Sequence, residues 1–307
     1  MIEGQEGVSW PQWLALAQAC EEHGVGTMFR SDHYLSFSDP ERRGSLDAWT
    51  QIAALAARTT TLRLGTLVSP ATFRHPSLLA KAVVTADHVS NGRVELGLGA
   101  GWMVPEHEQY GFPFPPTPVR VEMFAEQLEI VARSWTEERV DFQGRHYRLR
   151  GLKSLPRPLQ RPRPPIIVGG SGKPGTLRPA VQWADEYNTP FATVDELRDR
   201  RRRYDEALRE QNRDPATMRF SLMTGLVVGD SRTEALDRAR LLYERQGREH
   251  GFEEWLHHYS KASLVGSVDE VAERLREIEA VGVERVMLQH LLHEDLEPVR
   301  LIGALTG

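Results

Sequence analysis

The sequence predicts an α/β fold, specifically an eight-stranded (β/α)8 barrel, or TIM barrel. Short runs rich in β-branched residues alternate with longer stretches of 3.6-residue periodicity, which is typical of parallel strands joined by crossover helices. The 307 residues fall within the range that one such barrel fills. An open, doubly wound sheet is the competing fold. It should carry a G-x-G-x-x-G turn after its first strand, but the alternate glycines Gly97, Gly99 and Gly101 follow the predicted fourth strand.

The predicted elements cover the chain as one domain over residues 1–307. A thin first strand at 1–4 precedes strands at 25–29, 62–68, 93–98, 164–169, 186–189, 220–228 and 284–289. Helices are expected at 9–23, 46–58, 77–88, 119–135, 178–183, 194–211, 233–248 and 268–280, with a short closing helix at the end. Residues 104–118 are expected to form a Pro-rich loop. A β-hairpin insertion is expected at about 139–150, turning at Gln143-Gly144.

Composition limits the possible functions. Hydrophobic residues make up 40% and charged residues 26% of the chain, the balance of a folded protein with a large core. The net charge of −5 gives no general attraction to nucleic acid or anionic membrane. The longest apolar runs are too short for a bilayer span, and the N-terminus lacks the features of a signal peptide, so we expect a cytoplasmic protein. We expect no metal site, and the lone Cys20 is expected to pack as a small hydrophobe.

Barrel active sites lie at the carboxyl ends of the strands, so the polar residues there are candidates. Asp32 and His33 follow the second predicted strand, and a histidine can hold or donate a proton at neutral pH. The alternative is that Asp32 caps a turn and His33 satisfies loop backbone. Trp102 could stack on a substrate and Glu106 could accept a proton, although loop carboxylates are usually solvated.

Two glycine-rich stretches suggest ligand contacts. After strand four, Gly97, Gly99 and Gly101 would let a flat ligand approach the backbone, unless they only allow a tightly packed barrel rim. After strand five, a loop that enters a helix could present N–H groups to a phosphate. The loop consists of Gly169, Gly170, Ser171, Gly172 and Lys173. Pro174 and Gly175 argue against an immediate helix, so an ordinary Gly-rich turn is the alternative.

Several motifs resemble the luciferase-like monooxygenase family, and more narrowly its F420-dependent oxidoreductases. They span residues 9–289 in the family's order. They are SDHY at 31–34, LGTLVSPATFRHPSLLAKAVVTADHVSNGRVELGLGAGW at 64–102, Glu106-His107 with Tyr110-Gly111, PIIVGGSG at 165–172 and WADEYN at 183–188.

The resemblance implies a bacterial luciferase-like barrel with coenzyme F420, or alternatively FMN, lying across the strand ends. Asp32 and His33 would lie near the reactive edge of the ring, with Glu106 as a further catalytic candidate. The residues implied to contact the cofactor are Thr66, Leu67, Val68, Ser69, Gly99, Gly101, Trp102 and the 169–173 loop. A non-prolyl cis peptide is expected near Leu67, Val68 and Ser69, and a homodimer is expected. Trp102 stands where the sugar-phosphate dehydrogenases carry a glutamate, which argues against a sugar-phosphate substrate.

The function expected on this basis is hydride transfer between F420 and a small organic substrate. An FMN-dependent monooxygenase that uses O2 and a non-catalytic flavin-binding barrel are the alternatives.

A strip of basic residues favours F420 as the cofactor. Residues 142–184 contain no Asp or Glu but many basic residues, including Arg157, Arg161 and Arg163. Such a strip would suit the polyglutamate tail of F420 better than the single phosphate of FMN, unless it is only a solvated linker.

Overall fold

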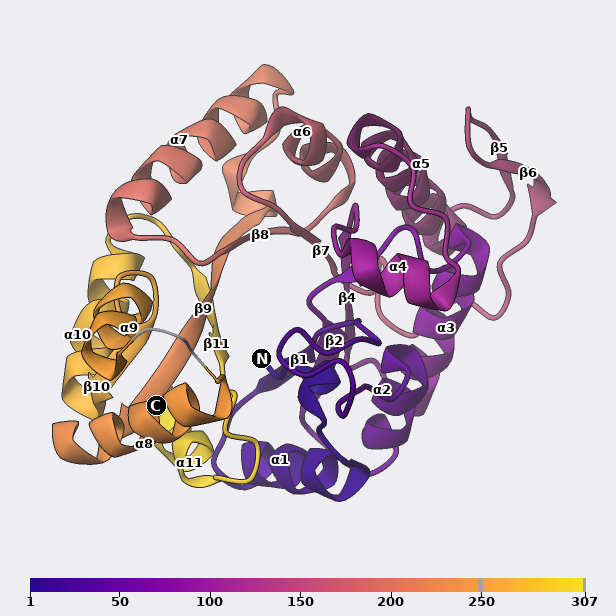
Figure 1. Cartoon of the computed structure of the whole chain (residues 1–307). Coiled ribbons are helices and arrows are strands. Elements are labelled where there is room, and N and C mark those ends of the chain that lie inside the picture. The colour runs from indigo at the N-terminus through magenta and orange to yellow at the C-terminus, as the bar shows by residue number, and fades with distance from the viewer. Residues whose placement is uncertain (248–250, 306–307) are drawn as a thin grey trace.

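The computed structural model describes residues 1–247 and 251–305, and its strands form a ring surrounded by helices (Figure 1). All neighbouring strands in the ring run parallel. Their order is β1 (Thr27–Arg30), β2 (Arg63–Thr66), β4 (Val94–Gly99), β7 (Ile166–Gly169), β8 (Glu186–Pro190), β9 (Arg219–Gly229) and β11 (Arg285–Gln289). The short β3 (Ser69–Pro70) continues the path of β2 and pairs with β4.

The first two residues close the ring between β11 and β1. On one side the Met1 nitrogen donates to Leu288 O at 2.8 Å, and His290 N donates to Met1 O at 3.0 Å. On the other side Ile2 N donates to Phe29 O at 2.9 Å and forms a parallel bridge with Arg30. This segment takes the place of the thin first strand, so the eight-stranded barrel is confirmed and the open doubly wound sheet is excluded.

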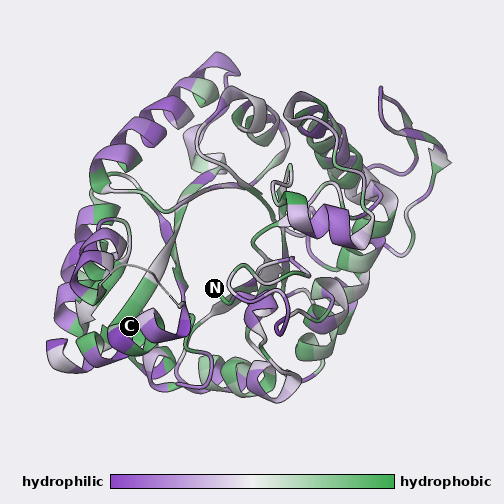
Figure 2. Cartoon of the chain, in the orientation of Figure 1, coloured by the Kyte–Doolittle hydropathy of each residue, from purple (hydrophilic) through white to green (hydrophobic). Residues whose placement is uncertain are grey.

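Helices cover the outside of the ring. In chain order they are α1 (Trp10–Glu22), α2 (Ala48–Ala56), α3 (Pro76–Val89), α5 (Thr117–Thr136), α6 (Pro174–Trp183), α7 (Val194–Glu210), α8 (Arg232–Arg245), α10 (Val268–Glu279) and α11 (Glu297–Leu305). Capping boxes at Ser9, Thr193 and Ser267 fix the starts of α1, α7 and α10. Apolar strand and helix residues such as Val83, Leu96 and Phe124 are fully buried between the two layers. The outer α7 is largely hydrophilic (Figure 2).

The predicted hairpin is confirmed as the antiparallel pair β5 (Val140–Gln143) and β6 (Arg148–Leu152), which extends away from the barrel (Figure 1).

Two expectations about proline were wrong. The predicted 104–118 loop contains α4 (Val104–Tyr110), and α6 begins at Pro174. Both helices tolerate proline because the first-turn N–H groups of a helix have no internal partner.

Some elements after β9 were not predicted. The short helix α9 (Phe252–Tyr259) and strand β10 (Leu264–Ser267) follow α8, and β10 pairs with the second half of β9. The predicted 233–248 helix ends at Arg245, and residue 248 lies outside the described part of the chain. The 3-10 turns η1 (Gly4–Glu6) and η2 (Pro215–Thr217) complete the elements.

Within residues 1–247 and 251–305, no helix is long and apolar enough to cross a membrane, and no cluster of potential metal ligands occurs.

Candidate active site

A cavity of about 950 Å³ lies at the carboxyl ends of the barrel strands. Eight of the predicted site residues lie on its wall: His33, Leu67, Val68, Gly101, Trp102, Gly169, Gly170 and Ser171. The predicted residues that do not reach the wall are Asp32, Thr66, Ser69, Gly99, Glu106, Gly172 and Lys173. The structure therefore brings the strand-end motifs to one place and divides the candidate residues into a wall and a supporting layer.

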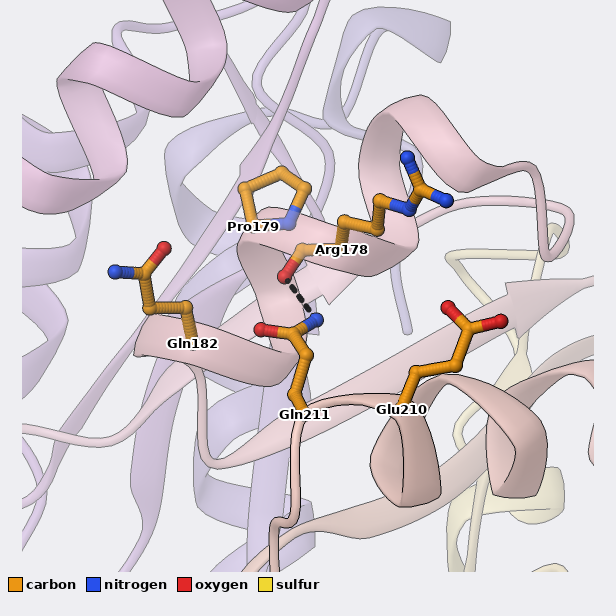
Figure 3. Close-up of a pocket in the computed structure, with 5 residues that line it drawn as sticks. All are labelled: Arg178, Pro179, Gln182, Glu210 and Gln211. Carbon is orange, nitrogen blue, oxygen red and sulfur yellow. Dashed lines mark hydrogen bonds between the residues drawn. The ribbon is translucent and has the colours of Figure 1, made fainter.

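A second, smaller hollow of about 390 Å³ lies between α6 and α7 on the outside of the barrel. Figure 3 shows its five lining residues, with the Gln211 amide donating to the Arg178 carbonyl at 3.0 Å. None of the predicted site residues lies in this hollow. The larger cavity is the candidate active site, because its position matches that of barrel active sites.

His33 is the wall residue best suited to proton transfer. Its Nδ1 lies 2.9 Å from Oε2 of Glu106, which is fully buried on α4. Because a carboxylate can only accept, Nδ1 must carry the proton of this hydrogen bond. The other carboxylate oxygen, Oε1, accepts from the backbone N–H groups of Tyr34 and Leu35, the first a very short contact and the second 3.1 Å long. Glu106 therefore fixes both the ring of His33 and the loop that carries it.

The surroundings of His33 favour its protonated form. Burial opposes a charge on the imidazole, but the hydrogen bond to Glu106 and the charge of that carboxylate outweigh it, so the pKa of His33 is raised above its usual value. The ring contacts Phe37 and Trp102 edge-on, at centroid distances of 5.0 and 5.7 Å. Trp102 and Phe37 are 65% and 46% exposed, so the cavity presents two aromatic surfaces beside this histidine.

Asp32, predicted as catalytic, lies behind the wall. Its carboxylate is 1% exposed, pairs with Arg74 at 2.6 Å and accepts from the Ser69 hydroxyl at 2.6 Å. Arg74 also binds Asp47 at 2.6 Å, which joins the loop after β1 to the start of α2. The geometry gives Asp32 a positioning role, because all these contacts hold the loop that carries His33 in place.

Two glycines of strand β4 leave room for neighbouring protein atoms that a side chain would displace. A Cβ on Gly97 would lie 2.0 Å from Thr66 O, and a Cβ on Gly99 would lie 2.7 Å from the Val68 side chain. The Leu67–Val68 peptide bond is cis, where the family resemblance placed such a bond. Gly101 lies on the cavity wall with φ +80°. The tightly packed rim therefore accounts for Gly97 and Gly99. At Gly101 the left-handed φ and the Thr72 hydroxyl, 2.8 Å from an added Cβ, also require glycine, although this residue lies on the cavity wall.

The 169–173 loop is built partly as expected for a phosphate site. It leads directly into α6, whose N-terminus faces the loop. However, Gly170 N–H donates to Asn188 O and Gly172 N–H to the Tyr187 hydroxyl, both at 2.9 Å. A side chain on Gly170 would meet the Tyr187 hydroxyl at 2.5 Å, so this glycine is required by packing. In the described part of the chain, the N–H groups of Ser171 and Lys173 donate to no other group and are the ones free to bind an anion.

Arg157, Arg161 and Arg163 of the proposed basic strip do not line the cavity, and this part of the prediction was wrong. Arg163 pairs with Asp185, and Arg157 donates to Ser134 O and Glu137 O. Residues 157–163 precede β7, so they lie at the amino ends of the parallel strands, whereas the cavity lies at the carboxyl ends. The strand predicted at 164–169 already implied this position, because residues that precede a barrel strand lie at its amino end.

Polar wall residues at three other strand ends were not predicted. Glu3 follows the closing segment, Asn188 lies in β8 and Gln289 ends β11, and all three line the cavity. Their position at the carboxyl ends of strands was the available signal. The strand predicted at 1–4 places Glu3 inside the strand, whereas the structure ends the closing segment at Ile2.

The fold and the cavity define a (β/α)8 barrel whose strand-end cavity carries the His33–Glu106 pair on its wall. The chain belongs to the luciferase-like monooxygenase family, whose family model matches residues 2–285. Both the predicted family and the predicted fold are thus confirmed.

Several known proteins are similar to the chain. It is 35% identical over 182 residues to an F420-dependent glucose-6-phosphate dehydrogenase of Nakamurella multipartita, covering 58% of this chain and 52% of that protein. It is 31% identical over 196 residues to the uncharacterized protein Rv0953c of Mycobacterium tuberculosis, covering 59% and 68%. The matched region thus spans about half the length of the dehydrogenase.

Solved structures show the same fold. A monooxygenase from Streptomyces bottropensis superposes with a TM-score of 0.81 at 24% identity, covering 96% of this chain and 91% of that one. An F420-dependent secondary alcohol dehydrogenase in complex with an F420-acetone adduct superposes with a TM-score of 0.80 at 20% identity, covering 99% and 97%.

Proposed function

We propose that this protein is an F420-dependent oxidoreductase that transfers a hydride between the deazaflavin and a small organic substrate. The observation that carries the proposal is His33, which lies on the cavity wall with its Nδ1 held by the buried Glu106 at 2.9 Å. Such a pair places a proton donor beside the reacting atoms of any ligand in the cavity. The similarity to F420-dependent glucose-6-phosphate dehydrogenases supports the choice of cofactor.

The residues present fit a flavin-like group. The cavity of about 950 Å³ has the size of cofactor sites. Leu67, Val68 and Gly101 form an apolar wall for a ring, and Ser171 and Lys173 offer free backbone N–H groups at the N-terminus of α6 for a phosphate. When bound, the deazaflavin would supply the hydride, or accept it, and the protein would orient and protect the reacting atoms.

His33 would handle the proton that accompanies hydride transfer. With Nδ1 bound to Glu106, the second ring nitrogen, Nε2, is the atom available to a substrate. The raised pKa favours the form in which that nitrogen also carries a proton, and this form can donate to a substrate oxygen or nitrogen as negative charge develops there. Glu106 would stabilise the imidazolium through its hydrogen bond to Nδ1. Trp102 and Phe37 would stack on or enclose the substrate.

Two other functions are compatible with the same site. An FMN-dependent monooxygenase is supported by the fold shared with the Streptomyces bottropensis monooxygenase. A non-catalytic flavin-binding barrel would use the same wall without turnover. The His33–Glu106 pair favours an enzyme, because a binding protein has no need of a positioned proton donor.

A turnover experiment separates the three functions. Purified protein is supplied with reduced and oxidised F420 over a panel of small alcohols, carbonyl compounds and amines, with cofactor absorbance as the signal. In parallel, oxygen consumption is measured with reduced FMN and the same compounds. We expect substrate-dependent change of F420 without oxygen uptake. Oxygen uptake with FMN alone would support the monooxygenase, and binding without turnover on the whole panel would support the idle barrel.

A further inference from the structure

The buried carboxylate of Glu3 is the starting point. Glu3 is 7% exposed and lies on the wall of the active-site cavity. It follows the segment that closes the barrel, so it occupies a strand-end position like that of Ser31 after β1. Its Oε1 accepts from the Gln289 amide at 2.6 Å and its Oε2 from the Gln5 amide at 2.7 Å. Both donors are neutral, so they orient the carboxylate without balancing its charge.

The other charged groups of the wall already have partners. Arg43 lies 3.6 Å from Glu6, Arg245 lies 2.6 Å from Glu294, and His33 is held by Glu106. In the described part of the chain, Glu3 forms no ion pair. A buried charge without a countercharge is costly, and a ligand that supplies the opposite charge removes much of that cost. Glu3 is therefore the wall group without a close countercharge. The Met1 amino group and His33 act on it only from beyond ion-pair distance, so a cationic ligand group could supply the close partner.

Apolar side chains line part of the same cavity. Phe37 and Trp102 lie with ring centroids 5.5 Å apart, and Met223, Leu242 and Leu291 line the same cavity. Aromatic faces attract organic cations, and aliphatic side chains bury the hydrocarbon part of a ligand. Glu3 also contributes to the raised pKa of His33, so it acts within electrostatic reach of the proton donor.

From this geometry we infer that Glu3, oriented by Gln289 and Gln5, is a specificity-determining residue that selects substrates with a protonated amine on an apolar, preferably aromatic, body. This rests on the proposed function in one respect only, which is that the cavity is the substrate site. The inference does not depend on whether the bound cofactor is F420 or FMN.

The test uses matched probes that differ in charge. Binding of benzylamine, benzyl alcohol and benzoate to the protein is measured by calorimetry at neutral pH, with and without saturating F420. We expect benzylamine to bind at least about tenfold more tightly than benzyl alcohol, because one close, partly buried charge pair exceeds the 1.4 kcal/mol that a tenfold change requires. Benzoate should bind more weakly than either.

Variants identify the residue responsible. Glu3→Gln should bring the benzylamine to benzyl alcohol ratio to within about threefold, whereas Glu3→Asp, which keeps the charge, should retain a preference for the amine. The double variant Glu6→Gln/Arg43→Gln is the matched control, because it removes a paired carboxylate from the same wall without changing net charge. It should keep the wild-type preference.

The outcomes separate this inference from the proposed function. An unchanged amine preference in folded Glu3→Gln would overturn it, and so would the absence of any preference in the wild type. If Glu3→Gln weakened F420 binding by more than about tenfold and left the probe ratio unchanged, the carboxylate would serve the cofactor instead. Failure of the wild type to bind F420 or FMN would count against the proposed function alone, because the probe ratio is also measured without cofactor.

Discussion

His33 and Glu106 are 73 residues apart in the sequence, yet His33 Nδ1 lies 2.9 Å from a carboxylate oxygen of Glu106. The histidine follows β1 and the glutamate lies on α4, so the barrel is what brings them together. The same carboxylate binds the N–H groups of the next two residues in the histidine's loop. Glu106 is therefore a positioning residue. Removing its carboxylate should change the pKa of His33 more than it changes the contacts between the cavity wall and a ligand.

Glu106→Gln should lower the pKa of His33 by about one unit or more, because it removes the negative charge and leaves the burial that opposes protonation. The pKa is measured by an NMR titration of the His33 ring. Glu108→Gln, on the exposed side of the same helix, is the control and should leave the midpoint unchanged. The pH at which turnover declines on the alkaline side should move down with the His33 midpoint. A midpoint that stays at the wild-type value would show that Glu106 does not control this histidine.

His33→Asn should reduce turnover by roughly two orders of magnitude or more, the usual contribution of a positioned proton donor. Cofactor affinity, measured by fluorescence titration, should remain within about threefold of wild type, because His33 contributes one contact among many on the cavity wall. Wild-type turnover in a variant that binds cofactor normally would exclude His33 as the proton donor.

Asp32→Asn should destabilise the fold by about 1 to 3 kcal/mol, because it removes the buried one of the two carboxylates that bind Arg74 and leaves only the partly exposed Asp47. Urea unfolding followed by circular dichroism gives the free energy of unfolding. Asp199→Asn, which removes exposed ion pairs on α7, is the control and should have little effect. If both variants were equally stable, the positioning role assigned to Asp32 would be wrong.

Lys173→Gln should weaken binding of F420 about threefold to tenfold and reduce its salt dependence, since Lys173 is the N-cap residue of α6 and its charge lies beside the proposed phosphate site. Arg161→Gln, an exposed residue at the other end of the barrel, should change neither quantity. Affinity is measured at about 0.05 and 0.5 M salt. Equal salt dependence in both variants and wild type would place the cofactor phosphate elsewhere.

Stability should fall on mild acidification because of His290 and His293. Burial lowers the pKa of His290 to about 4 and that of His293 to about 3, from an ordinary value near 6.5. Between these values the unfolded chain binds more protons than the folded one, so the stability present above pH 6.5 is lost as the pH falls. At pH 5 the loss should be about 2 kcal/mol for each residue.

Unfolding free energies between pH 7 and 5 test this loss, with the double variant His290→Asn/His293→Asn as the comparison. The double variant should lose clearly less stability on acidification than wild type. Parallel curves for the two proteins would contradict the account.

The sequence predicted the order of strands and helices well, because periodicity and turn residues are local signals. The barrel closure by Met1 and Ile2 was visible only as a weak first strand. The helix at Val104–Tyr110 was missed because its proline was read as a breaker, whereas proline is well tolerated in a first turn. The strand at Leu264–Ser267 was too short to separate from the helix that follows it.

The sequence predicted where the site lies, but not which candidate residues line the cavity and which hold the others in place. Motif positions placed Asp32, His33 and Glu106 at strand ends, but the pairing of Asp32 with Arg74 is a long-range contact that no local pattern reveals. Likewise, the N–H groups of Gly170 and Gly172 are bound by Asn188 and Tyr187 of the neighbouring strand, so only the structure shows which donors of the loop remain free.

Cofactor choice is decided by an equilibrium titration of the purified protein with F420 and, separately, with FMN, followed by cofactor fluorescence. We expect saturable F420 binding with a dissociation constant in the micromolar range or below, at least about tenfold tighter than that of FMN. Tighter binding of FMN, or no binding of F420, would contradict this expectation.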